Sequence, residues 1–326
     1  MVKLKRILCP IDLSPDSAKA LRYAAMLARA YRAKLLLCHC VETHAPTNGA
    51  GPHDDENVGA IFAALIAEHT TAADRAALDW EGAVVASDGH PASAIARAAA
   101  ERGIDLIVMR SRRRPRAAAL LGSTAEAVCR IAPCPVLVTH PQEREWIDQA
   151  DGEIRLRRIL VAYDFSDDAE LALRYGLSLA QEYGAEIHLL HVLQKPSTDG
   201  PEIAWLPTSA EDIYHHAARR LQKAMPEEAY QWCKVVHTLR WGKPYREVLA
   251  YAAEQEIDLI CMGAKGAGFG MSALFGSNVD RVLRQAPCPV LVARPLKPAV
   301  ESTQTSVNPL DKADIRLNVA RLSATG

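Results

Sequence analysis

The chain has 326 residues, of which 38 are basic and 39 acidic, and a formal net charge of −1. This length suits two domains, each large enough to bury its own core. The balanced charge argues against a nucleic-acid-binding protein, in which a basic bias is expected. No apolar run is long enough to cross a bilayer, and Pro10 and Asp12 interrupt the first apolar stretch, so we expect a cytoplasmic protein without a membrane partner.

The first half of the chain alternates short runs of branched apolar residues with longer helical patterns. Ser14, Pro15 and Asp16 form a favourable helix start, with an N-cap, a proline in the first turn and an acid that suits the helix dipole. Strands are expected at residues 6–11, 35–41, 83–86, 105–109 and 135–139. Helices are expected at residues 14–31, 58–78, 91–102 and 122–131.

The second half repeats this order of elements. Its strands are expected at residues 158–163, 186–193, 235–239, 258–262 and 289–293, and its helices at 167–183, 210–225, 245–255 and 277–285. Because the strands are continuously apolar, they favour a parallel sheet with helices on both faces. We therefore predict an α/β fold made of two tandem doubly wound domains, each with a five-stranded parallel sheet.

The two halves also share residues, which indicates a duplicated domain. Residues 7–12 read ILCPID and residues 159–164 read ILVAYD, while APCPVLV occurs at both 132–138 and 286–292. A repeat this long is not a solenoid. The expected parts are a first domain at 1–141, a linker at 142–156, a second domain at 157–296 and a weakly ordered tail at 297–326.

A glycine-rich run follows the fourth expected strand of the second half. Its spacing is Gly263-x2-Gly266-x9-Gly276-Ser277, and it leads into an expected helix. Glycine lets backbone N–H groups approach a ligand closely, and the free amides and positive dipole end of a helix start attract phosphates. The run therefore indicates an anion site.

Two side chains in the same run add to this site, namely the amide of Asn278 and the positive charge of Lys265. The order of residues differs from a Walker loop, because no Gly-Lys-Ser/Thr follows the glycines. A dinucleotide fingerprint is also excluded, since that motif follows the first strand of its domain.

These features together resemble the universal stress protein family. The glycine spacing, an aspartate at the end of a first strand and the closing CPVLV strands carry the resemblance, which covers both halves. It implies an adenine-nucleotide site in the second domain, for ATP with or without Mg²⁺. The residues it implies are Asp164 on the adenosine side, Val192 at the adenine, and Gly263, Gly266, Gly276, Ser277 and Asn278 along the ribose and phosphates, with Lys265 nearby.

The resemblance also has consequences for assembly, because domains of this family commonly pair through their last strands. Residues 135–139 and 289–293 would then meet in an internal pseudo-dimer, which protects exposed sheet edges. A homodimer of whole chains is an open possibility. The protein partners are unknown, although the long loops at 43–57 and 195–208 suit partner recognition.

The first half departs from the family pattern at the glycine run. Arg110 and Arg113 stand where the first two glycines belong, while Asp12 and the Gly-Ser-Thr sequence at 122–124 are kept. We expect the nucleotide site of the first domain to be lost or altered. The five arginines between 110 and 116 either form a solvated loop, which charge runs usually do, or bind a phosphorylated ligand or acidic partner.

Several patterns have simpler interpretations. A glycine-rich run can be a tight turn, and the aspartates that end the first strands can cap the following turn instead of acting in catalysis. Cys38-His39-Cys40 suggests a metal, but His39 points away from both cysteines on a strand and no second ligand pair follows. The eight cysteines show no small-scaffold disulfide pattern and fit a reducing compartment.

Three functions remain open at this stage. The first is a regulator in which nucleotide occupancy of the second domain changes the surface shown to partners. The second is a slow Mg²⁺-dependent ATP hydrolase, for which no catalytic base can be named from the sequence. The third is a scaffold whose clefts recruit another ligand or a protein.

Overall fold

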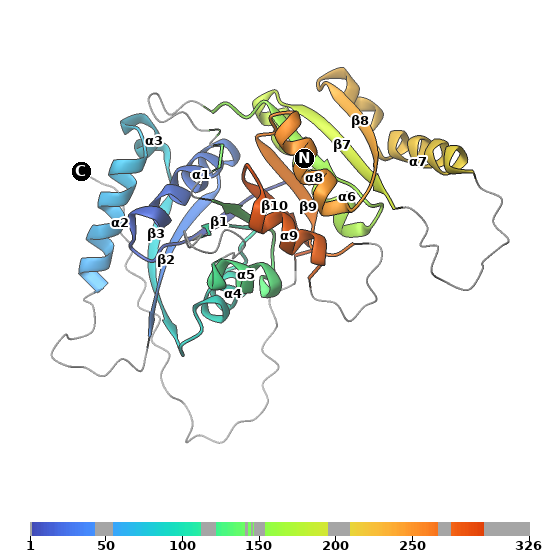
Figure 1. The fold of residues 1–326 in the computed structure, drawn as a ribbon. Coiled ribbons are helices and arrows are strands. Elements are labelled where there is room, and N and C mark those ends of the chain that lie inside the picture. The colour runs from blue at the N-terminus through green and yellow to red at the C-terminus, as the bar shows by residue number, and fades with distance from the viewer. Residues whose placement is uncertain are drawn as a thin grey trace, which may run out of the picture. The chain divides into compact units, whose positions relative to one another are not determined.

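Figure 1 shows the computed structural model of the chain. It describes residues 2–42, 55–111, 122–140, 143–144, 146, 154–194, 209–266 and 275–296. These residues fall into two compact units: an N-terminal unit built from residues 3–111 and 122–140, and a C-terminal unit within residues 143–294. No helix in the described ranges is both long and apolar enough to span a membrane.

The N-terminal unit is a parallel sheet flanked by helices, with strand order β3-β2-β1-β4-β5. Its strands are β1 (Arg6–Pro10), β2 (Lys34–Glu42), β3 (Trp80–Ser87), β4 (Leu106–Arg110) and β5 (Val136–Thr139). Its helices are α1 (Pro15–Tyr31), α2 (Asp55–His69), α3 (Ala72–Ala77), α4 (Pro91–Glu101) and α5 (Ser123–Ile131).

The C-terminal unit has the same topology, with strand order β8-β7-β6-β9-β10 and parallel pairing throughout. Its strands are β6 (Arg158–Ala162), β7 (Glu186–Leu193), β8 (Val235–Trp241), β9 (Leu259–Gly263) and β10 (Val290–Ala293). Its helices are α6 (Asp167–Tyr183), α7 (Ala210–Ala224), η1 (Glu227–Gln231), α8 (Pro244–Glu254) and α9 (Ser277–Gln285).

Burial explains why the strand sequences are continuously apolar. Every residue of β4 and of β9 is buried, because helices cover both faces of each sheet. The predicted fold class, two tandem doubly wound α/β units, is confirmed. In each unit the strand order reverses at the first strand, and this switch point opens a crevice at the carboxyl ends of the strands.

Some elements differ from the prediction only in their bounds, such as β3, which spans Trp80–Ser87 where a strand was expected at 83–86. Two other differences concern whole elements. The helix expected at 58–78 is divided into α2 and α3, because the Thr70 hydroxyl bonds back to the Ile66 carbonyl and competes with helix propagation. The short 3₁₀ helix η1 was not predicted. It follows Pro226, which removes a backbone donor and separates η1 from the end of α7.

Part of the segment predicted as a linker packs on the C-terminal unit. Trp146 is only 1% exposed and meets Tyr183 edge to face, with 6.3 Å between ring centroids. The Arg144 N–H donates to the Pro287 carbonyl at 2.8 Å. These contacts anchor the described part of the segment. The predicted weak order of the tail at 297–326 concerns residues outside those described.

Candidate functional site

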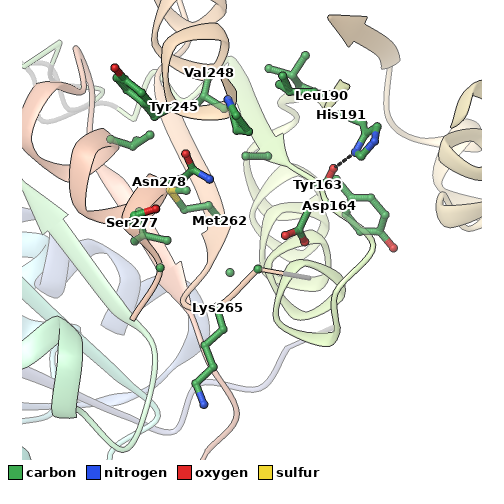
Figure 2. Close-up of a pocket in the computed structure, with 18 of the residues that line it drawn as sticks. Tyr163, Asp164, Leu190, His191, Tyr245, Val248, Met262, Lys265, Ser277 and Asn278 are labelled. Atoms are coloured by element: carbon green, nitrogen blue, oxygen red, sulfur yellow. Dashed lines mark hydrogen bonds between the residues drawn. The ribbon is translucent and has the colours of Figure 1, made fainter. Parts of the chain in front are cut away.

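A pocket of about 450 Å³ lies at the carboxyl ends of β6, β7 and β9 in the C-terminal unit (Figure 2). This position is the switch point of the sheet. The structure gathers around it all eight residues proposed from the sequence, which are Asp164, Val192, Gly263, Lys265, Gly266, Gly276, Ser277 and Asn278. Segments far apart in the chain therefore form one cavity, although their role in binding stays a prediction.

One end of the pocket is apolar. Leu190 and Val192 of β7 line it together with Met262 of β9 and Val248 of α8. Leu190, Val248 and Met262 are buried, so their side chains form a fixed wall that favours a flat apolar group over water.

The other end is polar and is formed by the start of α9. Gly276 is the N-cap, and no side chain of the residues that the structure describes caps the first turn. Ser277 and Asn278 follow at the positive end of the helix dipole. By contrast, the first turn of α6 is capped by the Ser166 hydroxyl, which accepts a hydrogen bond from the Ala169 N–H at 3.2 Å. The uncapped amides of α9 therefore suit an external anion.

Asp164 is held firmly between two elements. Its Oδ1 accepts hydrogen bonds from the Ser166 N–H at 3.2 Å and the Ser166 hydroxyl at 2.6 Å, so the carboxylate does cap the following turn. A Cβ added to Gly266 would lie 2.6 Å from the Asp164 Oδ2. The glycine loop therefore approaches the carboxylate as closely as a residue without a side chain allows.

Position 263 requires a glycine for a different reason from position 266, namely the close packing of two backbone segments. A Cβ there would lie 2.7 Å from the carbonyl carbon of Asp168 and 2.8 Å from the Ala169 nitrogen, both in the backbone of α6. Gly263 thus lets β9 pack against α6 and also lines the pocket. A substitution at this position would therefore disturb the packing of β9 against α6, whether or not a ligand is bound.

Lys265 contributes through its backbone. Its N–H donates to Asp168 Oδ2 at 3.0 Å, which fixes the loop to the start of α6. Burial raises the pKa of Asp168, while the bond from Lys265 lowers it in part. The exposed side chain of Lys265 points away from the other labelled pocket residues in Figure 2.

Tyr163, His191 and Tyr245 also line the pocket and were not proposed from the sequence. His191 donates from Nδ1 to the Tyr163 carbonyl at 2.7 Å, and burial lowers its pKa. The neutral ring therefore presents Nε2 as an acceptor. The matching histidine in the repeat was the available signal for His191, whereas no motif marks Tyr245 because the fold alone brings α8 to the pocket.

The N-terminal unit keeps part of this arrangement. Asp12 Oδ1 accepts from the Ser14 hydroxyl at 2.6 Å, and His39 Nδ1 donates to the Ile11 carbonyl at 2.8 Å. Arg110, however, occupies the position of Gly263, because it pairs with Thr139 as Gly263 pairs with Ala293. Arg113 and the rest of the arginine run lie outside the described residues.

Arg110 is only 7% exposed, and its guanidinium nitrogens lack a hydrogen-bond partner among the described residues. A bulky buried cation thus replaces a glycine at the edge of the crevice. The metal interpretation of Cys38-His39-Cys40 gains no support, since the described part of the chain holds no group of three or more His, Cys, Asp or Glu residues suited to a metal ion.

Comparison with known proteins gives one consistent result. A model described as the universal stress protein family matches residues 3–140 and 155–294. A universal stress protein of Mycolicibacterium smegmatis is 28% identical over 304 residues, covering 89% of this chain and 97% of the relative. One from Thermus aquaticus is 33% identical over 143 residues, covering 42% of this chain and 98% of the relative.

Solved structures agree with the sequence comparisons. The crystal structure of a universal stress protein from Archaeoglobus fulgidus superimposes with a TM-score of 0.60 and 26% identity, covering 90% of this chain and 97% of that protein. The similarity therefore extends over both units in one chain.

Proposed function

The chain belongs to the universal stress protein family, and from this premise we propose that its C-terminal unit binds an adenine nucleotide, ATP or a close relative. One observation carries the proposal: the uncapped first turn of α9 and an apolar wall formed by β7 and β9 face the same pocket. An aromatic base suits the wall, and phosphates suit the helix start.

The dimensions of the pocket support a ligand of this class. About 450 Å³ lies within the range of small-molecule sites, about 300–1,000 Å³. The close approach of Gly266 to Asp164 supports it further, because a residue without a side chain at this point leaves room for phosphates and for contacts from backbone N–H groups. Mg²⁺ would be held chiefly by the phosphates themselves.

Different residues of the pocket contact different parts of the ligand. Val192 and Leu190 contact the base, and Asp164 accepts hydrogen bonds from the adenosine part. Gly276, Ser277 and Asn278 donate to the phosphates from the start of α9. Occupancy then serves regulation, provided that ATP binds two conformations of the unit with different affinities, since only differential affinity shifts an equilibrium.

The N-terminal unit is expected to leave the nucleotide unbound, because Arg110 fills the position of Gly263. The test is calorimetric titration of ATP with Mg²⁺ into the nucleotide-stripped full-length protein. We expect one site per chain, lost in Gly276→Trp, whose side chain would fill the pocket. Gly122→Trp places the same side chain at the equivalent N-cap of α5 and should leave binding intact.

Each other outcome has a definite meaning. Two sites per chain would show that the arginine-containing unit also binds nucleotide. Absence of ATP binding would favour the scaffold function, and the glycine run would then be only a tight turn. Release of inorganic phosphate by the pure protein, absent in Gly276→Trp, would make it an ATP hydrolase as well as a binding protein.

A further inference from the structure

A second cavity of the C-terminal unit adjoins the pocket and has no role in the proposed function. Its volume is about 950 Å³, and it is lined by Phe165, by the end of β7 and by one side of α7, so we call it the α7 groove. Asp164 and His191 line both cavities and form the boundary between them. A ligand in the pocket can therefore extend into the α7 groove at this boundary.

Two arginines give the α7 groove its positive charge. Arg219 and Arg220 line it and are exposed, and neither forms a hydrogen bond or an ion pair with any residue that the structure describes. The carboxylates of Asp164 and Asp212, in contrast, each accept a hydrogen bond from a nearby serine hydroxyl. A guanidinium presents several N–H donors in a fixed fork that matches the oxygens of a phosphate. The α7 groove therefore suits a phosphate group.

Aromatic rings hold one of these arginines in position. The Cζ of Arg220 lies 3.9 Å from the centroid of the Phe165 ring, and the Phe165 and His191 rings lie 4.6 Å apart between centroids. The quadrupole of an aromatic ring attracts a cation placed over its face. The guanidinium is therefore fixed close to the boundary between the two cavities, and it loses less conformational entropy when it binds an anion.

The N-terminal unit lacks this arrangement. Leu13 takes the place of Phe165, in the same left-handed backbone conformation, with φ of 60° and 65° respectively. The equivalent helix α2 contains no arginine or lysine, whereas α7 contains Arg219, Arg220 and Lys223. The fold alone thus does not require the basic side of α7, which occurs in the unit that has the complete glycine run.

The two arginines lie apart from the proposed site of the 5′-phosphates. Ser277 and Asn278, at the start of α9, line the pocket but not the α7 groove. In Figure 2, Ser277 lies on the opposite side of the pocket from His191. In the proposed binding mode Asp164 contacts the adenosine part, so the part of the nucleotide nearest the α7 groove is the ribose.

We propose that the α7 groove binds a phosphate group on the ribose, so that the C-terminal unit prefers an adenine nucleotide phosphorylated at the 2′ or 3′ position as well as at the 5′ position. This inference rests on the proposed function. Of the two neighbouring ribose hydroxyls, one donates to the Asp164 carboxylate, and the other carries the phosphate that Arg219 and Arg220 bind. A ribose without this phosphate leaves both guanidiniums in contact with water.

The test is calorimetric titration of the nucleotide-stripped full-length protein with AMP, ADP, adenosine 2′,5′-bisphosphate and adenosine 3′,5′-bisphosphate. We expect one of the two bisphosphates to bind about tenfold more tightly than AMP, because it gains charge-assisted hydrogen bonds to the arginines. In ADP the second phosphate is attached to the first, so its affinity relative to AMP reports on the start of α9 instead of the α7 groove.

Conservative variants assign the gain to the arginines. Arg219→Gln and Arg220→Gln each remove one charge and keep a polar side chain. Each should reduce the preference for the bisphosphate over AMP, and the double variant should abolish it without changing the ratio of ADP to AMP affinity. The matched control is Lys223→Gln, which removes a charge from α7 outside the α7 groove and should keep the preference.

The other outcomes separate this inference from the proposed function. Equal affinities for AMP and both bisphosphates would overturn the inference and leave nucleotide binding intact. Binding of inorganic phosphate that Arg220→Gln abolishes, without a preference for either bisphosphate, would assign the α7 groove to a free anion and overturn the ribose assignment. If none of the four nucleotides binds, the proposed function and this inference are both refuted.

Discussion

The three glycines that line the pocket belong to one motif, but the structure constrains each of them differently. Gly263 is required by the backbone of α6, and Gly266 by the carboxylate of Asp164, whereas a Cβ on Gly276 would make ordinary contacts at 3.4 and 3.5 Å. The three positions therefore respond differently to the same small substitution, although they belong to one motif.

The first prediction follows from this difference. Gly266→Ala would force the Asp164 carboxylate from its place, because the hydrogen bonds from Ser166 hold its other oxygen. We expect ATP binding to weaken about tenfold, which corresponds to about 1.4 kcal/mol, with little loss of thermal stability. Calorimetry measures the affinity. Gly276→Ala is the matched control and should bind nearly as the wild type does; equal losses in both variants would contradict the argument.

A second prediction concerns the charge of Lys265. Its ammonium is exposed and points away from the pocket, while its N–H anchors the loop through Asp168. Lys265→Ala keeps the N–H and removes only an exposed charge, which contributes at most about 1 kcal/mol. We expect ATP affinity within about fivefold of the wild type. A complete loss of binding would place the ammonium on the phosphates.

At the scale of elements, the two duplicated units carry equivalent serine caps, so a substitution in one unit is a control for the same substitution in the other. The Ser166 hydroxyl caps α6 and holds Asp164, and the Ser14 hydroxyl caps α1 and holds Asp12 in the same way. Ser166→Ala and Ser14→Ala should each cost about 1 kcal/mol of stability, the usual value of an N-cap. Denaturant unfolding measures that cost in each variant.

Only the variant in the C-terminal unit is expected to affect ligand binding. Ser166→Ala frees the Asp164 carboxylate and should weaken ATP binding, whereas Ser14→Ala changes a unit whose crevice holds Arg110. Reduced affinity in Ser14→Ala, with the site of the C-terminal unit intact, would reveal a nucleotide contribution from the N-terminal unit.

At the scale of the whole molecule, histidines that are partly or fully buried make stability depend on pH. Burial lowers the pKa of His69, His188, His191 and His237. As the pH falls below about 6.5, the unfolded chain takes up protons that the folded chain takes up only at lower pH. Stability is therefore fully present above that pH and decreases below it.

Thermal unfolding between about pH 7.5 and 5.5 measures this dependence, and we expect the melting temperature to fall with the pH. His188 is 4% exposed and pairs its Nδ1 with the Tyr251 hydroxyl at 2.8 Å. His188→Asn should make the slope shallower. A melting temperature that rises as the pH falls through this range would refute the assignment.

The order of elements could be predicted because it is a local property of the chain. Continuous apolar runs marked the strands, and Ser14 marked the start of α1 where the structure also has its N-cap. The break between α2 and α3 was missed, since the periodicity continues through Thr70 while its hydroxyl bonds back to the previous turn. Trp146 was placed in a linker because its neighbours are polar, yet it is buried against Tyr183.

By itself, the sequence determined the duplication and the fold class, because repeats and periodicity are local properties of the chain. The eight candidate residues came from the glycine spacing together with the family resemblance that it supports. Tertiary structure alone decided which of these residues share a wall, why Gly263 lacks a side chain, and that Tyr245 and His191 complete the pocket. The physical reason is that the packing of α6 on β9, and of α8 on α9 and β7, joins segments far apart in the chain, and no local pattern encodes the distances between them.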